Sequence, residues 1–194
     1  MNIAAYQPFT LSDYPGKVAA IVFTQGCNFR CVYCHNACLI DMETPPAVDT
    51  EEFFSFLDRR KGKLGGVVIT GGEPTLQPDL ISFIERVKRM GFFVKLDTNG
   101  SRPKVLKELF ERNLIDYIAM DIKAPIEKYD IVAGVEVYKA DILESIRLII
   151  DRGGIHYQFR TTVFESMLSP DDLGKCAQLV EGAHSYVLQE GIQH

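Results

Sequence analysis

Three cysteines lie close together near the amino terminus of this 194-residue chain: Cys27, Cys31 and Cys34. Three residues separate the first pair and two separate the second, and the apolar run 19–23, a predicted strand, comes directly before them. Such spacing is typical of a metal site rather than of a disulfide framework. Cysteine thiolates hold iron–sulfur clusters, and a [4Fe–4S] cluster normally takes four of them. A group of three would leave one iron open to a substrate, unless Cys38 or a distant residue supplied the fourth ligand.

The same residues could instead bind zinc. Together with His35, the three cysteines would provide the tetrahedral sulfur and nitrogen ligands that zinc prefers. We expect the iron–sulfur cluster because of the motifs that follow along the chain. Cys38 is expected to be a free thiol near this site. Cys176 falls on the apolar side of a predicted helix, so we expect it in the core.

The spacing C-x-x-x-C-x-x-C resembles the cluster motif of the radical S-adenosylmethionine (SAM) superfamily. Its continuation at residues 33–36, Tyr-Cys-His-Asn, and the segment 13–17, Asp-Tyr-Pro-Gly-Lys, resemble the activating enzymes of glycyl-radical enzymes. Among these, the activating proteins of anaerobic ribonucleoside-triphosphate reductase are the most similar, and the resemblance covers nearly the whole chain. It implies one [4Fe–4S] cluster held by three cysteines, with SAM at the open iron and close to Tyr33, Cys34 and His35.

A second motif, Thr-Gly-Gly-Glu-Pro at residues 70–74, follows the next predicted strand. Two glycines let a backbone approach a ligand closely, and a carboxylate after them can receive an ammonium group. By itself this sequence indicates a tight turn. With the cysteine motif one β/α unit earlier, it resembles the Gly-Gly-Glu motif of the family. The resemblance implies that Gly71, Gly72 and Glu73 bind the methionyl amine of SAM.

The third predicted strand ends in Asp97-Thr98-Asn99-Gly100. Asp97 and Thr98 would point toward the mouth of a barrel, where they could bind ribose hydroxyls or a monovalent cation near the SAM carboxylate. The pair Asn99 and Gly100 indicates a turn, so a structural role competes with cofactor binding at these positions.

The fourth and fifth predicted strands each carry charged residues. Asp121 and Lys123 are two residues apart, so on an extended strand they face the same side. Burying a charge is costly unless it is paired, so the two residues predict either an ion pair or a ligand contact. The matching Asp-x-Lys of the activating enzymes implies contact with SAM. Arg160 matches a family arginine near the adenosyl group and the peptide-binding region, and we expect it to point inward.

The resemblance also implies a reaction. One electron passed to the sulfonium of the bound SAM would release methionine and a 5′-deoxyadenosyl radical. In the resembled family, this radical removes the α-hydrogen of one glycine in a large partner enzyme, and no amino-acid general base is needed. Only Cys38 and Cys176 remain for any further cluster. We therefore expect the single-cluster type, which takes its electrons from an external flavodoxin or ferredoxin.

Two other functions remain alternatives. A small-molecule radical SAM enzyme, such as a 7-carboxy-7-deazaguanine synthase-like protein, shares the cluster and the fold. A zinc-stabilised binding module without turnover would use the same cysteines. The segments 13–17 and 33–36, together with Asp-Thr-Asn-Gly at 97–100, favour the activating enzyme.

The composition is that of an ordinary globular protein, with 46% apolar residues, 24% charged residues and a net charge of −5. The densest basic run, residues 59–63, is short and indicates a solvated helix end rather than a nucleic-acid site. Residues 1–8 lack the features of a signal peptide, and no apolar run approaches the roughly 20 residues of a membrane span. Five cysteines, an odd number, fit a reducing compartment. We expect a cytoplasmic protein that binds neither nucleic acid nor membrane.

Apolar runs of strand length alternate with helical patterns along the chain, which is typical of a parallel α/β sheet. The predicted strands are residues 19–24, 66–70, 92–98, 117–122, 156–163 and 185–189. The predicted helices begin near Asp49 or Thr50, near Leu80, at Pro103, near Ile142 and at Ser169. Six units are too few for an eight-stranded barrel, which takes roughly 250 residues. The sequence predicts an α/β fold, and the resemblance implies the partial (β/α)6 barrel of the radical SAM type, open on one side.

We expect a single domain over residues 1–194, in which an N-terminal segment, 1–18, precedes the β/α units of 19–189. Sites in such folds gather where strands end and helices begin, and each motif above sits at such a junction. The open side would leave a lateral gap wide enough for a peptide. Members of the resembled family commonly continue past the sixth strand, so either a short form is complete here or a closing segment lies beyond it.

Overall fold

The protein is described by a computed structural model, which covers residues 1–191. Its seven-stranded sheet has its strands side by side in chain order, from β1 to β7. β1 runs antiparallel to β2, and each later pair of neighbours is parallel. The strands are β1 (Ile3–Thr10), β2 (Ala19–Thr24), β3 (Gly66–Gly71), β4 (Phe93–Thr98), β5 (Tyr117–Asp121), β6 (His156–Val163) and β7 (Tyr186–Glu190).

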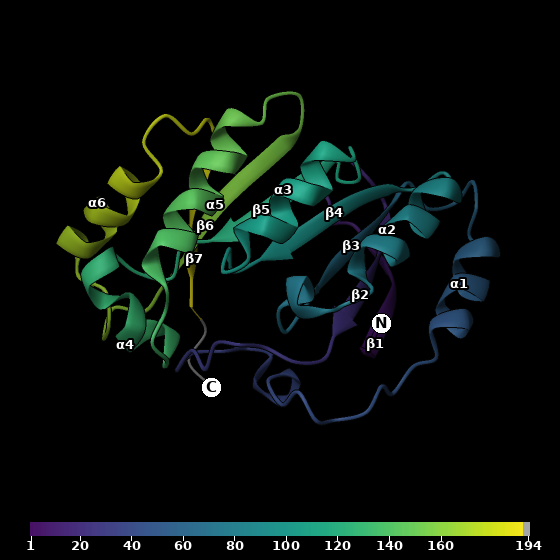
Figure 1. Cartoon of the computed structure of the whole chain (residues 1–194), viewed down its shortest axis with the longest axis horizontal. Coiled ribbons are helices and arrows are strands. Elements are labelled where there is room, and N and C mark those ends of the chain that lie inside the picture. Colours follow the sequence, from purple (N-terminus) through teal and green to yellow (C-terminus); the bar gives the residue numbers. More distant parts are fainter. Residues whose placement is uncertain (192–194) are drawn as a thin grey trace.

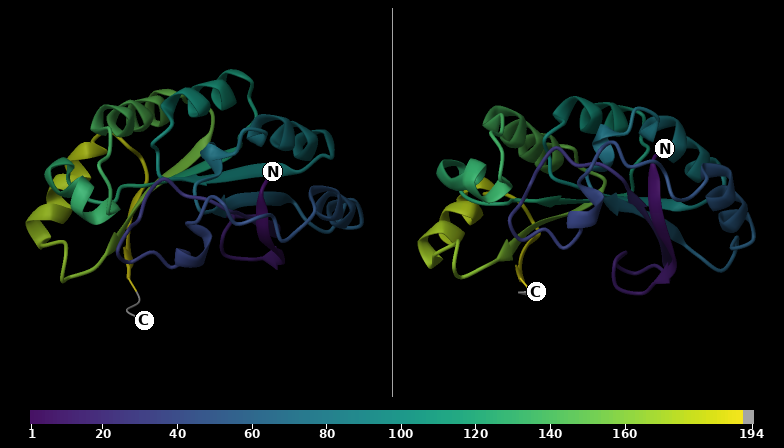
Figure 2. Two further views of the ribbon diagram at one scale, coloured as in Figure 1. Left: turned by 60° about the horizontal axis from the view of Figure 1, so that its bottom comes forward. Right: turned by 90° about the horizontal axis from the view of Figure 1, so that it is seen from below.

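Helices cover the outer face of this sheet, and the turn between β1 and β2 lies on the opposite side (Figures 1 and 2). The α-helices are α1 (Thr50–Asp58), α2 (Leu80–Arg89), α3 (Pro103–Glu111), α4 (Tyr129–Ala133), α5 (Lys139–Asp151) and α6 (Pro170–Leu179). Three short 3₁₀ helices are η1 (Ala37–Leu39), η2 (Pro74–Leu76) and η3 (Ile126–Lys128).

The sheet curves but does not close, because β1 and β7 form its two edges and do not pair with each other in residues 1–191. The six parallel strands are those expected from the sequence. The predicted open, partial barrel is therefore confirmed. All six parallel strands direct their carboxyl ends to one edge of the sheet, and the loops that follow them meet there.

β1 was not expected, because the sequence 3–10 gives a weak strand signal. It contains Pro8, which cannot donate a ladder hydrogen bond and is tolerated at edges and bulges. β1 is such an edge strand, and its register against β2 shifts twice, between Ile3 and Ala5 and between Gln7 and Thr10. These irregularities let the edge strand include a proline, but they hide the alternating pattern by which strands are recognised.

The core lies between the sheet and its helices. Each of five neighbouring strands contributes a fully buried apolar side chain to it: Val22, Ile69, Leu96, Ile118 and Phe159. Cys176 of α6 is fully buried in the same cluster, as predicted. Among residues 1–191, no helix has both the length and the apolar composition needed to cross a bilayer.

The lower end of the barrel interior, opposite the carboxyl ends of the strands, is filled by the loop between β1 and β2. Tyr14 of this loop is buried against Ile21 and Val68. A Cβ atom on Gly66 would come within 2.9 Å of the Tyr14 ring, so the strand can accept the ring only because residue 66 is a glycine. The segment 13–17 therefore has a structural role, since Tyr14 anchors it beneath the site.

Helix starts follow the predicted capping signals. Asp49 is the N-cap of α1 and accepts hydrogen bonds from the backbone N–H groups of Glu51 and Glu52, at 2.7 and 3.2 Å. Pro103 opens α3, and Ser169 forms a capping box with Asp172 at the start of α6. α4 was not expected; it has only five residues and ends at Gly134, in the left-handed region at φ 67°.

Acid is expected to weaken the start of α6. Lys128 donates a hydrogen bond to the Asp172 carboxylate at 2.6 Å, and with the Ser169 backbone N–H and hydroxyl it lowers the pKa of Asp172 to about 2. The unfolded pKa is about 3.9, so this stabilisation is complete above pH ~4 and is lost as the pH falls through about 2. In urea unfolding, Asp172→Asn should be less stable than wild type at pH 7, and the two should converge near pH 2. A difference that persists unchanged at pH 2 would contradict this origin.

Candidate active site

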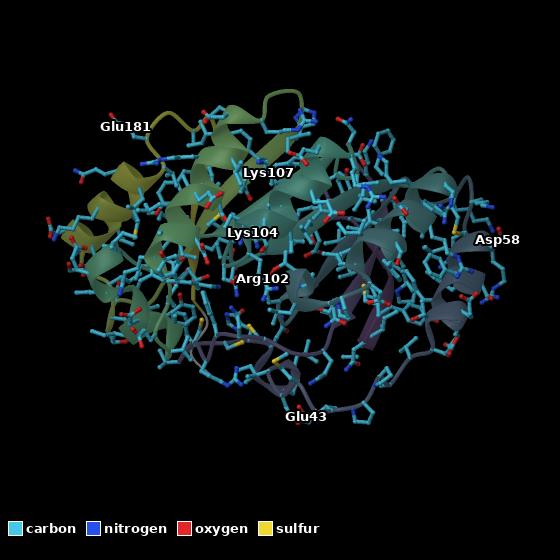
Figure 3. All side chains as sticks on the ribbon, in the orientation of Figure 1. Glu43, Asp58, Arg102, Lys104, Lys107 and Glu181 are labelled. Carbon is cyan, nitrogen blue, oxygen red and sulfur yellow. The ribbon has the colours of Figure 1, made fainter. Side chains whose placement is uncertain are left out.

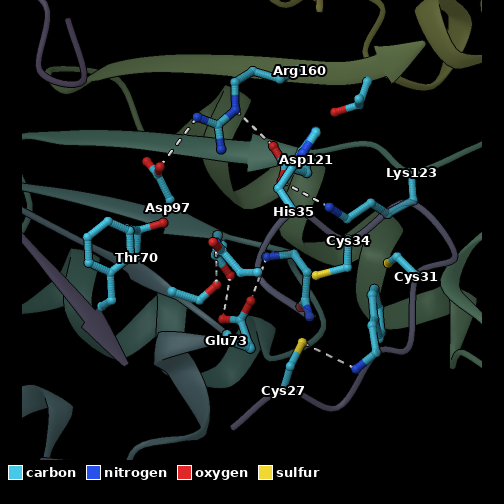
Figure 4. Close-up of a pocket in the computed structure, with 18 of the residues that line it drawn as sticks. Cys27, Cys31, Cys34, His35, Thr70, Glu73, Asp97, Asp121, Lys123 and Arg160 are labelled. Atoms are coloured by element: carbon cyan, nitrogen blue, oxygen red, sulfur yellow. Dashed lines mark hydrogen bonds and ion pairs between the residues drawn. The ribbon is translucent and has the colours of Figure 1, made fainter. Parts of the chain in front are cut away.

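A cavity of about 390 Å³ opens at the carboxyl ends of β2 to β6. Such a volume is within the range of small-molecule sites. All the site residues predicted from the sequence line it: Cys27, Cys31, Tyr33, Cys34, His35, Gly71, Gly72, Glu73, Asp97, Thr98, Asn99, Asp121, Lys123 and Arg160. In Figure 4, Cys31, Cys34 and Lys123 lie together on one side of this pocket, and Asp97 and Thr70 on the other.

The three cysteines lie on one loop, residues 25–41, which main-chain hydrogen bonds hold in shape. The Gly26 and Cys27 N–H groups donate to the carbonyls of Leu39 and Ile40, at 2.8 and 3.1 Å, so the loop closes on itself. Within it, the Cys34 N–H donates to the Cys31 carbonyl at 3.0 Å. Main-chain hydrogen bonds therefore join the two ends of the loop and fix the turn between Cys31 and Cys34.

The thiols meet the chemical requirements of an iron–sulfur site. Burial raises the pKa of Cys27 to about 11 and also raises the pKa of Cys31, so binding of a cationic cluster would have to displace their protons. In residues 1–191, no group of three His, Cys, Asp or Glu side chains converges closely enough to hold a single metal ion. Cys27, Cys31 and Cys34 all line one pocket, and cysteine thiolates are the ligands of iron–sulfur clusters.

The two glycines of the Gly-Gly-Glu motif each allow a close approach of main-chain atoms. Gly71 has φ 116°, and a Cβ atom on it would come within 2.3 Å of the Thr24 backbone nitrogen in β2. A Cβ atom on Gly72 would come within 2.1 Å of the Gly26 carbonyl oxygen, where the Glu73 N–H donates to that carbonyl at 2.8 Å. Gly71 thus lets β3 approach β2, and Gly72 lets the motif cross the cysteine loop. Residues 71–73 fix the cysteine loop against the end of β3.

Gly72→Ala is expected to lower the free energy of unfolding of the cluster-free protein by about 2 kcal/mol, because the added methyl group overpacks the crossing. Gly174→Ala is the matched control: it lies inside α6, and no atom lies within 4 Å of its added Cβ. It should stabilise by about 1 kcal/mol through helix propensity. Urea unfolding measures both, and equal effects of the two substitutions would contradict the steric argument.

Glu73 is fully buried, and its carboxylate already accepts several hydrogen bonds. One oxygen accepts the Thr75 N–H at 3.1 Å, the Thr75 hydroxyl and the Thr98 hydroxyl at 2.8 Å. The other accepts the Asn99 N–H at 2.6 Å, and the residue lines the pocket. Burial raises the pKa of Glu73, and these donors oppose that effect. An approaching ammonium group would add a positive charge that favours the ionised form.

Five charged side chains form a row of ion pairs across β4, β5 and β6. Arg160 lies in the middle, with Nε 2.8 Å from Asp121 Oδ1 and Nη1 3.4 Å from Asp97 Oδ2. Lys123 Nζ lies 3.0 Å from Asp121 Oδ2, and Lys95 contacts Asp97. The predicted inward orientation of Arg160, and the shared face of Asp121 and Lys123, are confirmed. The row has three positive and two negative groups, so one positive charge is left to attract an anion.

Two members of this row are held in their charged forms by their neighbours. Burial alone would raise the pKa of Asp121, but the positive charges of Lys123 and Arg160 outweigh it and lower this pKa below its ordinary range. Burial would lower the pKa of Lys123, and Asp121 outweighs it and raises that pKa. Asp121 and Lys123 therefore both stay ionised at neutral pH.

The side chains next to the cysteines and after β4 also have structural contacts. Tyr33 stacks on Phe164 with ring centroids 4.6 Å apart, and its hydroxyl donates to the Lys123 carbonyl at 3.4 Å. Asn99 donates through Nδ2 to Asn28 Oδ1 at 3.0 Å, which ties the cysteine loop to the β4–α3 turn. Asn99 therefore has the structural role that its sequence offered as one of two possibilities.

The pocket includes residues that the sequence did not single out as ligand contacts. Asp13 reaches it from the β1–β2 loop, because buried Tyr14 anchors that loop below the site. Thr162 lines it from β6, two residues after Arg160, and Gln189 lines it from β7. Side chains two residues apart on a strand face the same side, so the inward position of Arg160 could have indicated that Thr162 also lines the pocket. Asp13 belongs to the segment 13–17, which was noted only because it resembles the activating enzymes and not as a ligand contact.

The family model of the Radical SAM superfamily matches residues 21–172, most of the chain. A protein of Methanocaldococcus jannaschii with the provisional name glycyl-radical enzyme activating enzyme is 36% identical over 182 residues, which are 92% of this chain and 75% of that protein. A pyruvate formate-lyase-activating enzyme of Clostridium pasteurianum is 34% identical over 127 residues, 63% of this chain. The match spans 52% of that enzyme, so this chain corresponds to about half of it.

Two further matches are a relative named for another reaction and a solved structure with a similar fold. A 7-carboxy-7-deazaguanine synthase of Methanopyrus kandleri is 32% identical over 132 residues, which cover 58% of this chain and 52% of that protein. The solved structure of anSMEcpe with bound AdoMet, which is SAM, has a TM-score of 0.66 at 17% identity and covers 87% of this chain and 50% of that one. The structural match supports the same fold.

Proposed function

This chain belongs to the radical SAM superfamily, and from that premise we propose that it cleaves SAM to install a glycyl radical on a partner enzyme. It is a radical SAM enzyme, and its family uses a [4Fe–4S] cluster and SAM. The partner would be of the anaerobic ribonucleotide reductase or pyruvate formate-lyase type. The names of the relatives from M. jannaschii and C. pasteurianum support this class of reaction.

Cys27, Cys31 and Cys34 would hold the cluster, because their thiols are the three that line the pocket. A cluster held there would supply the one electron that splits the sulfonium of SAM into methionine and a 5′-deoxyadenosyl radical. The chain's own residues orient SAM and exclude water from it.

The methionyl end of SAM would lie near the Gly-Gly-Glu motif, where the Glu73 carboxylate would accept its ammonium group. The row of ion pairs carries one surplus positive charge, which would attract the SAM carboxylate to Lys123 or Arg160. Asp97 and Thr98 would bind ribose hydroxyls or a monovalent cation. Tyr33 and His35 would flank SAM beside the cluster.

The observation that carries this proposal is that every predicted site residue, from five separate segments, lines one pocket. These segments are far apart in the sequence and share only their position near the carboxyl end of a parallel strand. The open side of the sheet, between β7 and β1, would admit a glycine-containing segment of the partner. An external flavodoxin or ferredoxin would supply the electrons.

The test is anaerobic cleavage of SAM by the reconstituted protein, with 5′-deoxyadenosine measured with and without a glycyl-radical enzyme. We expect about four irons per chain, one 5′-deoxyadenosine per activation and a glycyl-radical EPR signal on the partner. Efficient cleavage that depends on a small molecule, with no radical on the partner, would favour the synthase-like alternative. One zinc and no iron after reconstitution would contradict the proposal altogether.

A further inference from the structure

The surface beside the cysteine loop carries basic side chains that the proposed reaction does not use. Arg102 and Lys104, at the start of α3, are exposed, and neither has an ion-pair partner among residues 1–191. Figure 3 shows Lys107, Lys104 and Arg102 in a row along α3, with Arg102 at the end toward the cysteine loop. Arg30, within that loop, is also exposed. We call Arg30, Arg102 and Lys104 the basic patch.

A direct contact joins the basic patch to the cluster loop. Asn28, between Cys27 and Cys31, donates through Nδ2 to the Ser101 hydroxyl at 2.9 Å, and Ser101 immediately precedes Arg102. Arg30 donates through Nη1 to the carbonyls of Cys27 and Phe29, at 2.6 and 2.9 Å. The patch therefore adjoins the loop whose cysteines line the pocket.

The charges at the start of α3 oppose the helix dipole. Negative groups are favourable at a helix N-terminus and positive groups are unfavourable there. α1 and α6 follow this rule, with acidic residues in their first turns, Glu51 and Glu52 in one and Asp171 and Asp172 in the other. α3 has no acidic residue in its first turn, and its N-cap, Arg102, makes no capping hydrogen bond. Helix stability does not account for this arrangement.

The sign of the patch is also opposite to that of the whole chain, whose net charge is −5. An acidic protein would be repelled by this molecule at long range, so its productive approach needs a local region of positive potential. Within the loop, Asp41 is an acid close enough to interact with Arg30 of the patch. Hydrogen bonds from the Thr44 hydroxyl and the Glu43 N–H lower the pKa of Asp41, and Arg30 lowers it further.

We propose that the basic patch is the docking surface for an acidic one-electron carrier protein that reduces the cluster. This inference rests on the proposed function, which requires such a donor. In the docked complex, one electron leaves the reduced carrier, which is oxidised by one electron, and enters the cluster, which is reduced by one electron. Transfer across the outer side of the loop keeps the carrier away from the pocket, so SAM can remain bound while the electron arrives.

The test compares two charge-reversed proteins. Arg102→Glu with Lys104→Glu alters the patch and places acids at the N-terminus of α3, where the dipole favours them, so folding should not suffer. Lys61→Glu with Lys63→Glu makes the same change in net charge before β3, at the opposite end of the parallel strands. Binding of a flavodoxin to each reconstituted protein is measured by calorimetry at 50 mM and 500 mM salt, and cluster reduction by stopped-flow absorbance.

We expect the patch variant to bind flavodoxin at least about tenfold more weakly than the control at low salt, with the difference shrinking at high salt. Zero-length cross-linking should join Lys104 to a carboxylate of the carrier. Cleavage of SAM driven by dithionite, which needs no docking, should match wild type in both variants. Failure of dithionite-driven cleavage in the wild type would instead refute the proposed function. The flavodoxin affinities of the two variants would still test the docking surface separately.

Three results would overturn the docking surface. Equal flavodoxin affinity in the patch variant and the control would show that these charges do not recruit the carrier. A loss of dithionite-driven cleavage would show that the charges act on the cluster loop itself. Normal cluster reduction with a loss of radical transfer to the glycyl-radical enzyme would assign the patch to that protein substrate.

Discussion

Replacing Cys31 with alanine is expected to reduce SAM cleavage to background. The remaining Cys27 and Cys34 would leave two irons of a cubane without protein ligands, and a [4Fe–4S] cluster normally needs at least the three thiolates of this loop. Bound iron after anaerobic reconstitution should fall well below about four per chain, with loss of the visible absorption of the cluster. Iron analysis and 5′-deoxyadenosine release measure the two effects independently.

The other two cysteines are the matched controls. Cys38 is exposed, and Cys38→Ser should keep both iron content and turnover. Cys176 is buried in the core, and Cys176→Ala should keep turnover near wild type. Normal turnover in Cys31→Ala, or loss of the cluster in Cys38→Ser, would contradict the assignment of three ligands.

Removing the Asp121 carboxylate is expected to have the second largest effect. Asp121→Ala leaves Lys123 and Arg160 in a partly buried site without their shared anion. Breaking one side of a buried ion pair costs about 3 kcal/mol, and we expect a loss of that order in the free energy of unfolding of the cluster-free protein. Affinity for SAM should fall as well, because the two cations would no longer be held at the pocket wall.

The stability that Asp121 contributes should depend on pH in a definite direction. Because the pKa of Asp121 is lowered on folding, its contribution is complete above its unfolded pKa of about 4 and is lost only in stronger acid. Asp130→Ala is the control: Asp130 pairs with Lys139 at 2.5 Å on the surface, and its removal should change stability much less. Comparable losses in the two variants would show that the row across the sheet is not a buried network.

The fold was predictable because its parallel strands are buried. Runs such as 19–23 and 67–69 are apolar throughout, and capping residues such as Asp49 and Ser169 mark the starts of helices. The residues of the pocket were predictable for a related reason: polar motifs that directly follow parallel strands must meet at one edge of the sheet. Neither inference needs long-range contacts.

What the sequence did not provide were interactions between distant segments. Gly72 is required by the crossing with Gly26, and Gly71 by its approach to Thr24, and spacing along the chain encodes neither contact. The ion pairs of Arg160 with Asp97 and Asp121 depend on the order in which strands pair. β1 was missed because an irregular edge strand gains its hydrogen bonds only after β2 is in place.

The peptide hydrogen bonds that close the 25–41 loop have a consequence for which residue types the loop can contain. The Gly26–Leu39, Cys27–Ile40 and Glu73–Gly26 bonds join main-chain atoms, and every residue type except proline supplies the N–H donor that they need. Side chains elsewhere in the loop can therefore be exchanged without loss of its closure.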